Sequence, residues 1–188
     1  MNQPFFTYDQ ESGEKAGVSS FEGGAYVGMF TEAKYKKANS GSHGLEFTFE
    51  TPDGSTFNYL TIYFAKANND PIKMGQNVLN ALMGLMNVRA LNWTQKDGEN
   101  YCEELADKPI GLFLQKVLYT KNDGDDGYRF EIKMPFDVKT RQTLKEMVGN
   151  IEAKTINSLS ESYQDKDERG QNQTSQHPKQ QAAGVWPV

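Results

Sequence analysis

The side chains best suited to chemistry in this chain are aromatic rings that alternate along short extended runs. In the run 57–65, Tyr59 and Tyr63 fall on one side, while Leu60 and Ile62 fall on the other. Because the aliphatic side can supply the core, the two tyrosines are left for a surface, and a tyrosine-rich surface favours a ligand that lies on it. The alternative is that both rings pack inside the fold.

Basic residues accompany these rings. Lys34, Lys36 and Lys37 form the one dense cationic cluster and lead into the Gly/Ser-rich connection 39–44. Cationic side chains bind phosphates, and aromatic rings stack on unpaired bases for about 1–3 kcal/mol per base. The pattern therefore predicts a surface that binds single-stranded nucleic acid without sequence preference, although each residue alone could be an ordinary packing ring or a solvated cation. The candidates are Tyr59, Tyr63, Tyr26, Phe30, Tyr35, Lys34, Lys36, Lys37, Lys116, Lys121, Arg129 and Lys133.

No pattern of residues points to catalysis. Cys102 is the single cysteine, and the two histidines, His43 and His177, are too far apart along the chain to give zinc-ligand spacing. The acidic turn 122–127 lacks the spacing of a calcium-binding loop. The sequence also has no phosphate-binding loop and no Gly-x-Ser-x-Gly motif. We therefore expect a binding protein without a metal or cofactor, and not an enzyme.

Five extended runs and one helix must position the candidate residues. The helix is expected at Met74–Val88, between the third and fourth runs, where apolar residues recur with helical spacing. This order of elements is typical of the OB-fold, a mainly β, five-stranded Greek-key barrel. The sequence leaves open which face of the first strand points inward, because both faces carry apolar groups. The predicted strands are Ala25–Lys37, Gly44–Thr51, Phe57–Ala65, Ile110–Lys121 and Gly127–Phe136.

The two ends of the chain differ from this middle part. Residues 1–20 lack periodicity and predict a flexible leader to a domain over 21–159. A second helix is predicted over Thr140–Ser160, with a sparse apolar stripe that packs on the barrel or on a second subunit of a homo-oligomer. Residues 160–188 are polar and predict a disordered tail. Its apolar tip, with Val185, Trp186 and Pro187, is a candidate site for recruiting partner proteins.

Composition sets limits on these predictions. The net charge of -5 argues against a uniformly basic nucleic-acid binder, so any phosphate-binding stripe must be local. A single cysteine fits a reducing compartment. The sequence shows no signal peptide and no apolar stretch long enough to cross a membrane. We therefore expect a cytoplasmic protein with no membrane contact.

Several motifs carry a resemblance to a known family. The run 24–34, the dipeptide Ser40-Gly41, a strand that ends in the turn 52–54, and the leucines at 79, 82 and 85 before Gly111 resemble phage-encoded single-stranded DNA-binding proteins. The match covers residues 21–136. The resemblance implies an OB-fold and nonspecific DNA binding during phage DNA replication and recombination in the host cytoplasm. It also implies that the tail recruits replication or recombination proteins.

The acidic charge keeps other functions open. A β-barrel that binds proteins, such as a virion or assembly component, would use the aromatic face for a protein partner. An enzyme inhibitor that mimics DNA would use its negative charge directly. Binding that survives high salt and ignores DNA would favour the protein-binding alternative.

Overall fold

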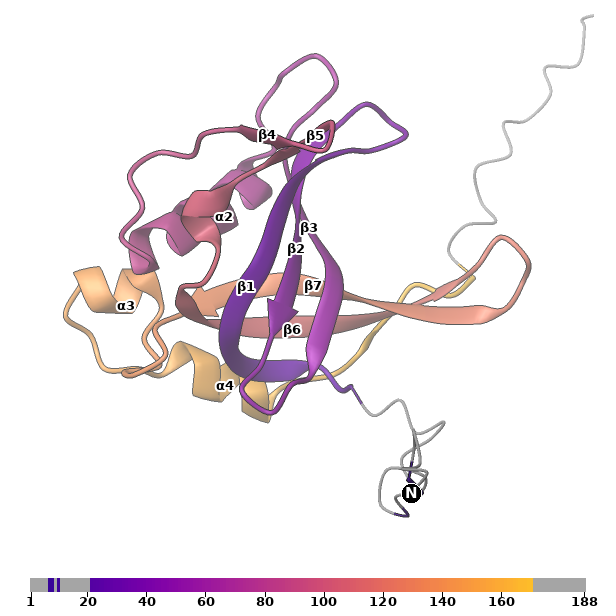
Figure 1. Ribbon diagram of the computed structural model, residues 1–188. Coiled ribbons are helices and arrows are strands. Elements are labelled where there is room, and N and C mark those ends of the chain that lie inside the picture. Colours follow the sequence, from indigo (N-terminus) through magenta and orange to yellow (C-terminus); the bar gives the residue numbers. More distant parts are fainter. Residues whose placement is uncertain (1–6, 9, 11–20, 171–188) are drawn as a thin grey trace, which may run out of the picture.

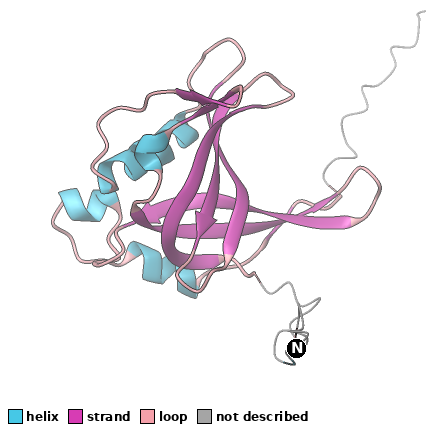
Figure 2. Cartoon of the chain, viewed as in Figure 1, coloured by secondary structure: helices cyan, strands magenta, loops and turns pink. Residues whose placement is uncertain are grey.

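The chain folds into a mainly β structure. The computed structural model describes residues 7, 8, 10 and 21–170, and Figure 1 shows long strands with helices along one side. Figure 2 separates the helices from the strands by colour. The long strands are β1 (Gly24–Lys37), β2 (His43–Glu50), β3 (Thr56–Ala65), β6 (Pro109–Thr120) and β7 (Asp126–Phe136). The short elements are α2 (Lys73–Leu85), β4 (Thr94–Lys96), β5 (Glu99–Tyr101), the 3-10 helix Glu103–Leu105, α3 (Leu144–Val148), α4 (Thr155–Glu161) and β8 (Lys166–Asp167).

The five predicted strands are confirmed to within one residue at each end. In β2 the alternation of Leu45, Phe47 and Phe49 with polar residues matches the two faces of a strand, whereas β6 is buried continuously from Ile110 to Leu114. The first predicted helix is confirmed as α2, but it ends at Leu85, three residues before the predicted end at Val88. Asn87 takes a positive φ of 53° there, and a left-handed residue of this kind ends a helix.

Strand β1 is shared between two parts of the sheet. Its first half pairs with β6, and its second half pairs with β2, with the change of partner at Met29. A bulge between Phe30 and Glu32 accompanies the change, and bulges bend a strand and increase its twist. Gly28 permits the close approach, because a Cβ atom there would lie 2.1 Å from the Glu50 carbonyl oxygen. In Figure 1 the β1–β3 part stands across the β6–β7 hairpin, which projects far beyond it.

The long strands are connected in the order β3-β2-β1-β6-β7. All of these pairings are antiparallel, and β8 adds a two-residue parallel pairing to β6. Within the described residues β3 and β7 form no strand pairing with each other, so the sheet stays open along this seam. The order of the long strands and α2 along the chain agrees with the prediction, but a closed barrel is not confirmed.

The interior of the sheet is built from phenylalanines and leucines. The ring of Phe30 is fully buried and stacks on Phe47 at a centroid distance of 4.4 Å. The structure also settles which face of β1 points inward. Tyr26 and Phe30 face the core before the bulge, and Ala33 faces it afterwards, because the extra residue reverses the alternation.

The single helix predicted over residues 140–160 is wrong. Two short helices, α3 and α4, occupy this segment and are separated by a turn. Thr143 begins α3 with a capping box in which its side chain accepts from the Glu146 amide, while the Glu146 side chain accepts from the Thr143 amide. Gly149 ends α3, and Asn150 follows with a positive φ of 51°. This Gly-Asn pair breaks the helix that the sparse apolar pattern suggested.

The prediction of disorder from residue 160 onward is wrong for residues 161–170. Strand β8 pairs with β6 at Val117 and Leu118, and Arg169 forms an ion pair of 2.9 Å with Asp126 in the hairpin. The predicted partner-binding tip, with Val185, Trp186 and Pro187, lies outside the described residues, as does most of the leader. Among the residues that are described, no helix is long and apolar enough to cross a membrane.

Candidate nucleic-acid interface

The solvent side of strands β1–β3, here called the outer face, carries several of the predicted residues. Lys34 lies opposite Glu46, and in the next row Lys36 lies opposite Gly44, which in turn pairs with Tyr63. Because side chains two residues apart share a face of a strand, both rows point away from the core. The outer face therefore combines two of the predicted lysines with one of the predicted tyrosines.

Tyr59 is the most exposed of the predicted rings. Its side chain is 77% exposed, and its backbone takes a positive φ of 62° within an irregular part of β3, where the register shifts against β2. A positive φ is uncommon for a residue other than glycine and often occurs where the chain positions a functional side chain. The Thr61 hydroxyl donates a hydrogen bond of 3.2 Å to the Tyr59 carbonyl oxygen and supports this conformation.

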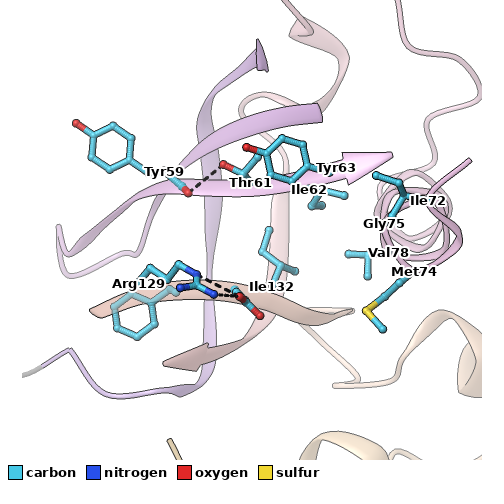
Figure 3. Close-up of a pocket in the computed structure, with 12 residues that line it drawn as sticks. Tyr59, Thr61, Ile62, Tyr63, Ile72, Met74, Gly75, Val78, Arg129 and Ile132 are labelled. Atoms are coloured by element: carbon cyan, nitrogen blue, oxygen red, sulfur yellow. Dashed lines mark hydrogen bonds and ion pairs between the residues drawn. The ribbon is translucent and has the colours of Figure 1, made fainter. Parts of the chain in front are cut away.

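A groove of about 510 Å³ adjoins the outer face along the open seam between β3 and β7. Figure 3 shows aliphatic side chains from three elements directed into it, namely Ile62 of β3, Val78 of α2 and Ile132 of β7. The predicted residues Tyr59, Tyr63 and Arg129 also line this groove. The fold therefore brings together three candidates that are up to seventy residues apart in the sequence.

The cations near this surface are paired with carboxylates of the same chain. Lys36 Nζ lies 2.8 Å from Glu46 Oε2, and this hydrogen bond is the largest cause of a raised pKa for Lys36. Lys34 Nζ lies 3.5 Å from one carboxylate oxygen of Glu32 and 3.9 Å from one of Glu99. The outer face is therefore a mixture of both charges and not a purely cationic trough.

Arg129 is held in a similar way at the groove. Its guanidinium forms ion pairs of 2.8 Å with Glu131 and 2.7 Å with Glu168. The same group lies 5.6 Å from the centre of the Tyr119 ring, which is within the range of a cation–π contact. Three contacts fix the orientation of Arg129, and its positive charge is largely balanced by the two carboxylates.

Three predicted stacking residues are not available on the outer face. Phe30 as a base platform is wrong, because its ring is fully buried in the core. Tyr26 packs on the ring of Phe57 at 4.6 Å, and its hydroxyl donates to a backbone carbonyl. Tyr35 makes an edge contact of 5.5 Å with Trp93 at another end of the sheet. Core packing therefore accounts for Phe30 and for most of the Tyr26 ring.

The remaining predicted cations are dispersed. The Lys116 side chain is only 13% exposed, pairs with Glu22 at 3.3 Å and lies 5.3 Å from the centre of the Tyr128 ring. Lys37, Lys121 and Lys133 are exposed, and none of them forms an ion pair with another described residue. These four lysines therefore do not join Lys34 and Lys36 in one continuous stripe.

Two further surface residues had no clear signal in the sequence. Tyr101 of β5 lies opposite Lys34, and its hydroxyl donates a bond of 2.9 Å to Glu99. Met74 of α2 is 78% exposed at the groove. Tyr101 falls in a strand of only three residues, which is too short for alternation to be recognised. Met74 was assigned to the helix, but helical periodicity does not show which β-strand the helix packs against.

No known protein family and no curated protein matches this sequence. Among the described residues there is also no group of three or more His, Cys, Asp or Glu side chains that could hold a metal ion. The outer face, the groove and the order of the strands are therefore the features that bear on function.

Proposed function

We propose that this protein is an OB-fold protein that binds single-stranded DNA without sequence preference, as the resemblance to phage-encoded proteins implies. The pairing of β1 with both β2 and β6, and the position of α2 between β3 and β6, support the OB-like arrangement. The observation that carries the proposal is the exposure of Tyr59 beside Tyr63, on a strand whose aliphatic residues already fill the core.

In this proposal bases stack on Tyr59 and Tyr63 of β3, and phosphates contact Lys34 and Lys36 of β1, on the other side of β2. Stacking tolerates any sequence because every base has an aromatic face. Arg129 lines the adjoining groove and provides a further cation for the same strand of DNA. The binding would serve phage DNA replication or recombination, with the C-terminal tail as the site for partner proteins.

Titration of a fluorescent oligo(dT) with the full chain tests the proposal. We expect Tyr59→Ala and Tyr63→Ala each to weaken binding by about tenfold, the lower to middle range of one lost stacking contact. Tyr8→Ala is the control, because Tyr8 is equally exposed at 77% but precedes the sheet. Absence of binding at micromolar protein in low salt would contradict the proposal. Unchanged affinity in both tyrosine variants would move the interface elsewhere.

The paired carboxylates favour one competing function, the binding of a protein partner. A surface on which Lys34, Lys36 and Arg129 are already neutralised suits an uncharged or mixed partner better than a polyanion. In that case the outer face would bind its protein partner even at high salt, and oligo(dT) would not compete with that partner. DNA binding instead requires a steep loss of affinity as salt rises.

A further inference from the structure

We infer that the Glu46 carboxylate competes with a DNA phosphate for the Lys36 ammonium group, so that DNA loads by exchange of one anion for another at this lysine. The inference rests on the proposed function and assigns Glu46 as a residue that sets the affinity of the outer face. Glu46 was not among the residues singled out in the sequence, where it reads as an ordinary polar position of β2.

The burial of the pair supports this role. The Glu46 side chain is only 8% exposed, while the Lys36 side chain is 41% exposed. The carboxylate therefore approaches the ammonium group from the sheet side and leaves the solvent side of the lysine open. An incoming phosphate can reach Lys36 without any movement of the backbone.

The surroundings place the pair on the route that we propose for DNA. Lys36 and Tyr63 both pair with Gly44, one from each side of β2. Because glycine has no side chain, nothing on β2 separates the lysine from the tyrosine ring in that row. A base stacked on Tyr63 would consequently bring its phosphate close to the Lys36–Glu46 pair.

The exchange has an energetic cost. Lys36 is the one ion-pair partner of Glu46 among the described residues, so a phosphate that draws the lysine away leaves a nearly buried carboxylate with only the longer-range attraction of Lys34. The same carboxylate then lies beside the negative phosphate. Both effects oppose binding, and the native protein should therefore bind DNA more weakly than its lysines alone would allow.

The pairs formed by Lys34 should matter less. The Glu32 and Glu99 side chains are 39% and 57% exposed, so water can solvate them when the lysine turns to a phosphate. Their distances to Lys34, 3.5 and 3.9 Å, are also longer than that of the Lys36–Glu46 pair. Among the lysine pairs of the outer face, the inference is accordingly specific to Glu46.

A double-mutant cycle on the full chain tests the inference, with oligo(dT) as the probe over about 50–200 mM salt. The four proteins are the native chain, Glu46→Gln, Lys36→Gln and the double variant. We expect Glu46→Gln to tighten binding roughly three- to tenfold at low salt. The slope of the logarithm of the binding constant against the logarithm of the salt concentration should become steeper by up to about 0.7. In the Lys36→Gln background the same change should alter affinity by less than about twofold.

Glu152→Gln is the matched control, because Glu152 also pairs with a lysine, Lys154 at 3.2 Å, but in the turn between α3 and α4. We expect it to leave DNA affinity unchanged. If Glu46→Gln tightens DNA binding equally in the native and the Lys36→Gln backgrounds, the inference is overturned. The effect would then be only a general repulsion of DNA by the negative charge of Glu46. Native affinity in Glu46→Gln would also overturn the inference. Failure of both the native chain and Glu46→Gln to bind DNA would reject the proposed function itself.

Discussion

Two glutamates of this protein are almost equally buried and yet belong to very different surroundings. Glu46 on the outer face is 7% exposed, and Glu146 at the start of α3 is 6% exposed. Glu146 accepts hydrogen bonds from the amide and hydroxyl groups of Thr143 and Thr155 and from the amide of Lys154. Within the described part of the chain, Glu46 has one ion-pair partner, Lys36.

The hydrogen-bond donors around each glutamate distinguish a structural carboxylate from an exchangeable one. Fixed backbone amides saturate Glu146, and they join the cap of α3 to the start of α4. A flexible lysine balances Glu46, and a lysine can turn to another anion at little conformational cost. Burial alone does not separate the two cases, whereas the number and kind of donors does.

Substitution of each glutamate by glutamine should give the largest contrast. Glu146→Gln places an amide NH₂ group against backbone N–H donors and should lower the free energy of unfolding by about 3 kcal/mol. Glu46→Gln keeps a hydrogen-bond acceptor for a half-exposed lysine and should change it by less than about 1 kcal/mol. Urea denaturation of both variants measures the difference. Equal destabilisation would show that the contrast between the two sites is wrong.

Lowering the pH should reduce the stability of the fold in particular through Glu146. Burial by itself raises the pKa of Glu146, but donation from the backbone amides of Lys154, Thr143 and Thr155 outweighs it and lowers the pKa to about 2. Because the folded pKa lies below the ordinary value of 4.5, this carboxylate stabilises the fold fully above that value. Its contribution should be lost as the pH falls from about 4.5 to about 2. As the pH is lowered through this range, the urea concentration at the midpoint of unfolding should fall less for Glu146→Gln than for the native chain.

The capping box that holds Glu146 should contribute a smaller part. Thr143→Ala removes a hydroxyl that donates to Glu146 Oε2 at 2.9 Å and accepts from the Glu146 amide, so we expect a loss of about 1–2 kcal/mol. Thr143→Ser keeps the hydroxyl and should recover most of the stability. Thermal unfolding of both variants measures the effect, and an alanine variant as stable as the serine variant would argue against the role of the box.

The smallest effect on stability is expected for Lys36. Lys36→Gln removes a cation whose side chain is 41% exposed, but the glutamine amide can still donate to the nearly buried Glu46 carboxylate, so we expect a loss of at most about 1 kcal/mol. The same variant should nevertheless lose affinity for oligo(dT), because the proposed phosphate contact disappears. A large loss of stability would instead make the Lys36–Glu46 pair structural, as Glu146 is.

Local sequence patterns were sufficient to predict the five long strands, as a period of two where one face is polar and as an extended apolar run where both faces are apolar. Leu45, Phe47 and Phe49 of β2 are all buried, as that period requires. The helix α2 followed from its 3.6-residue period in the same way. One local signal was overlooked, namely Thr143 and Glu146 three residues apart, which is the sequence pattern of a capping box.

The pairing of side chains from distant strands could not be read from these local periods. A bulge after Phe30 reverses which residues of β1 face inward, and the Gly-Asn turn at 149–150 divides the last predicted helix. The carboxylate that neutralises each lysine comes from another strand in all but one of the pairs on the outer face. Local periodicity was enough to define most strands and helices, because hydrophobic burial acts on every second or every third to fourth residue. Which charges meet depends instead on the tertiary fold, because strand register depends on contacts between residues far apart in the chain.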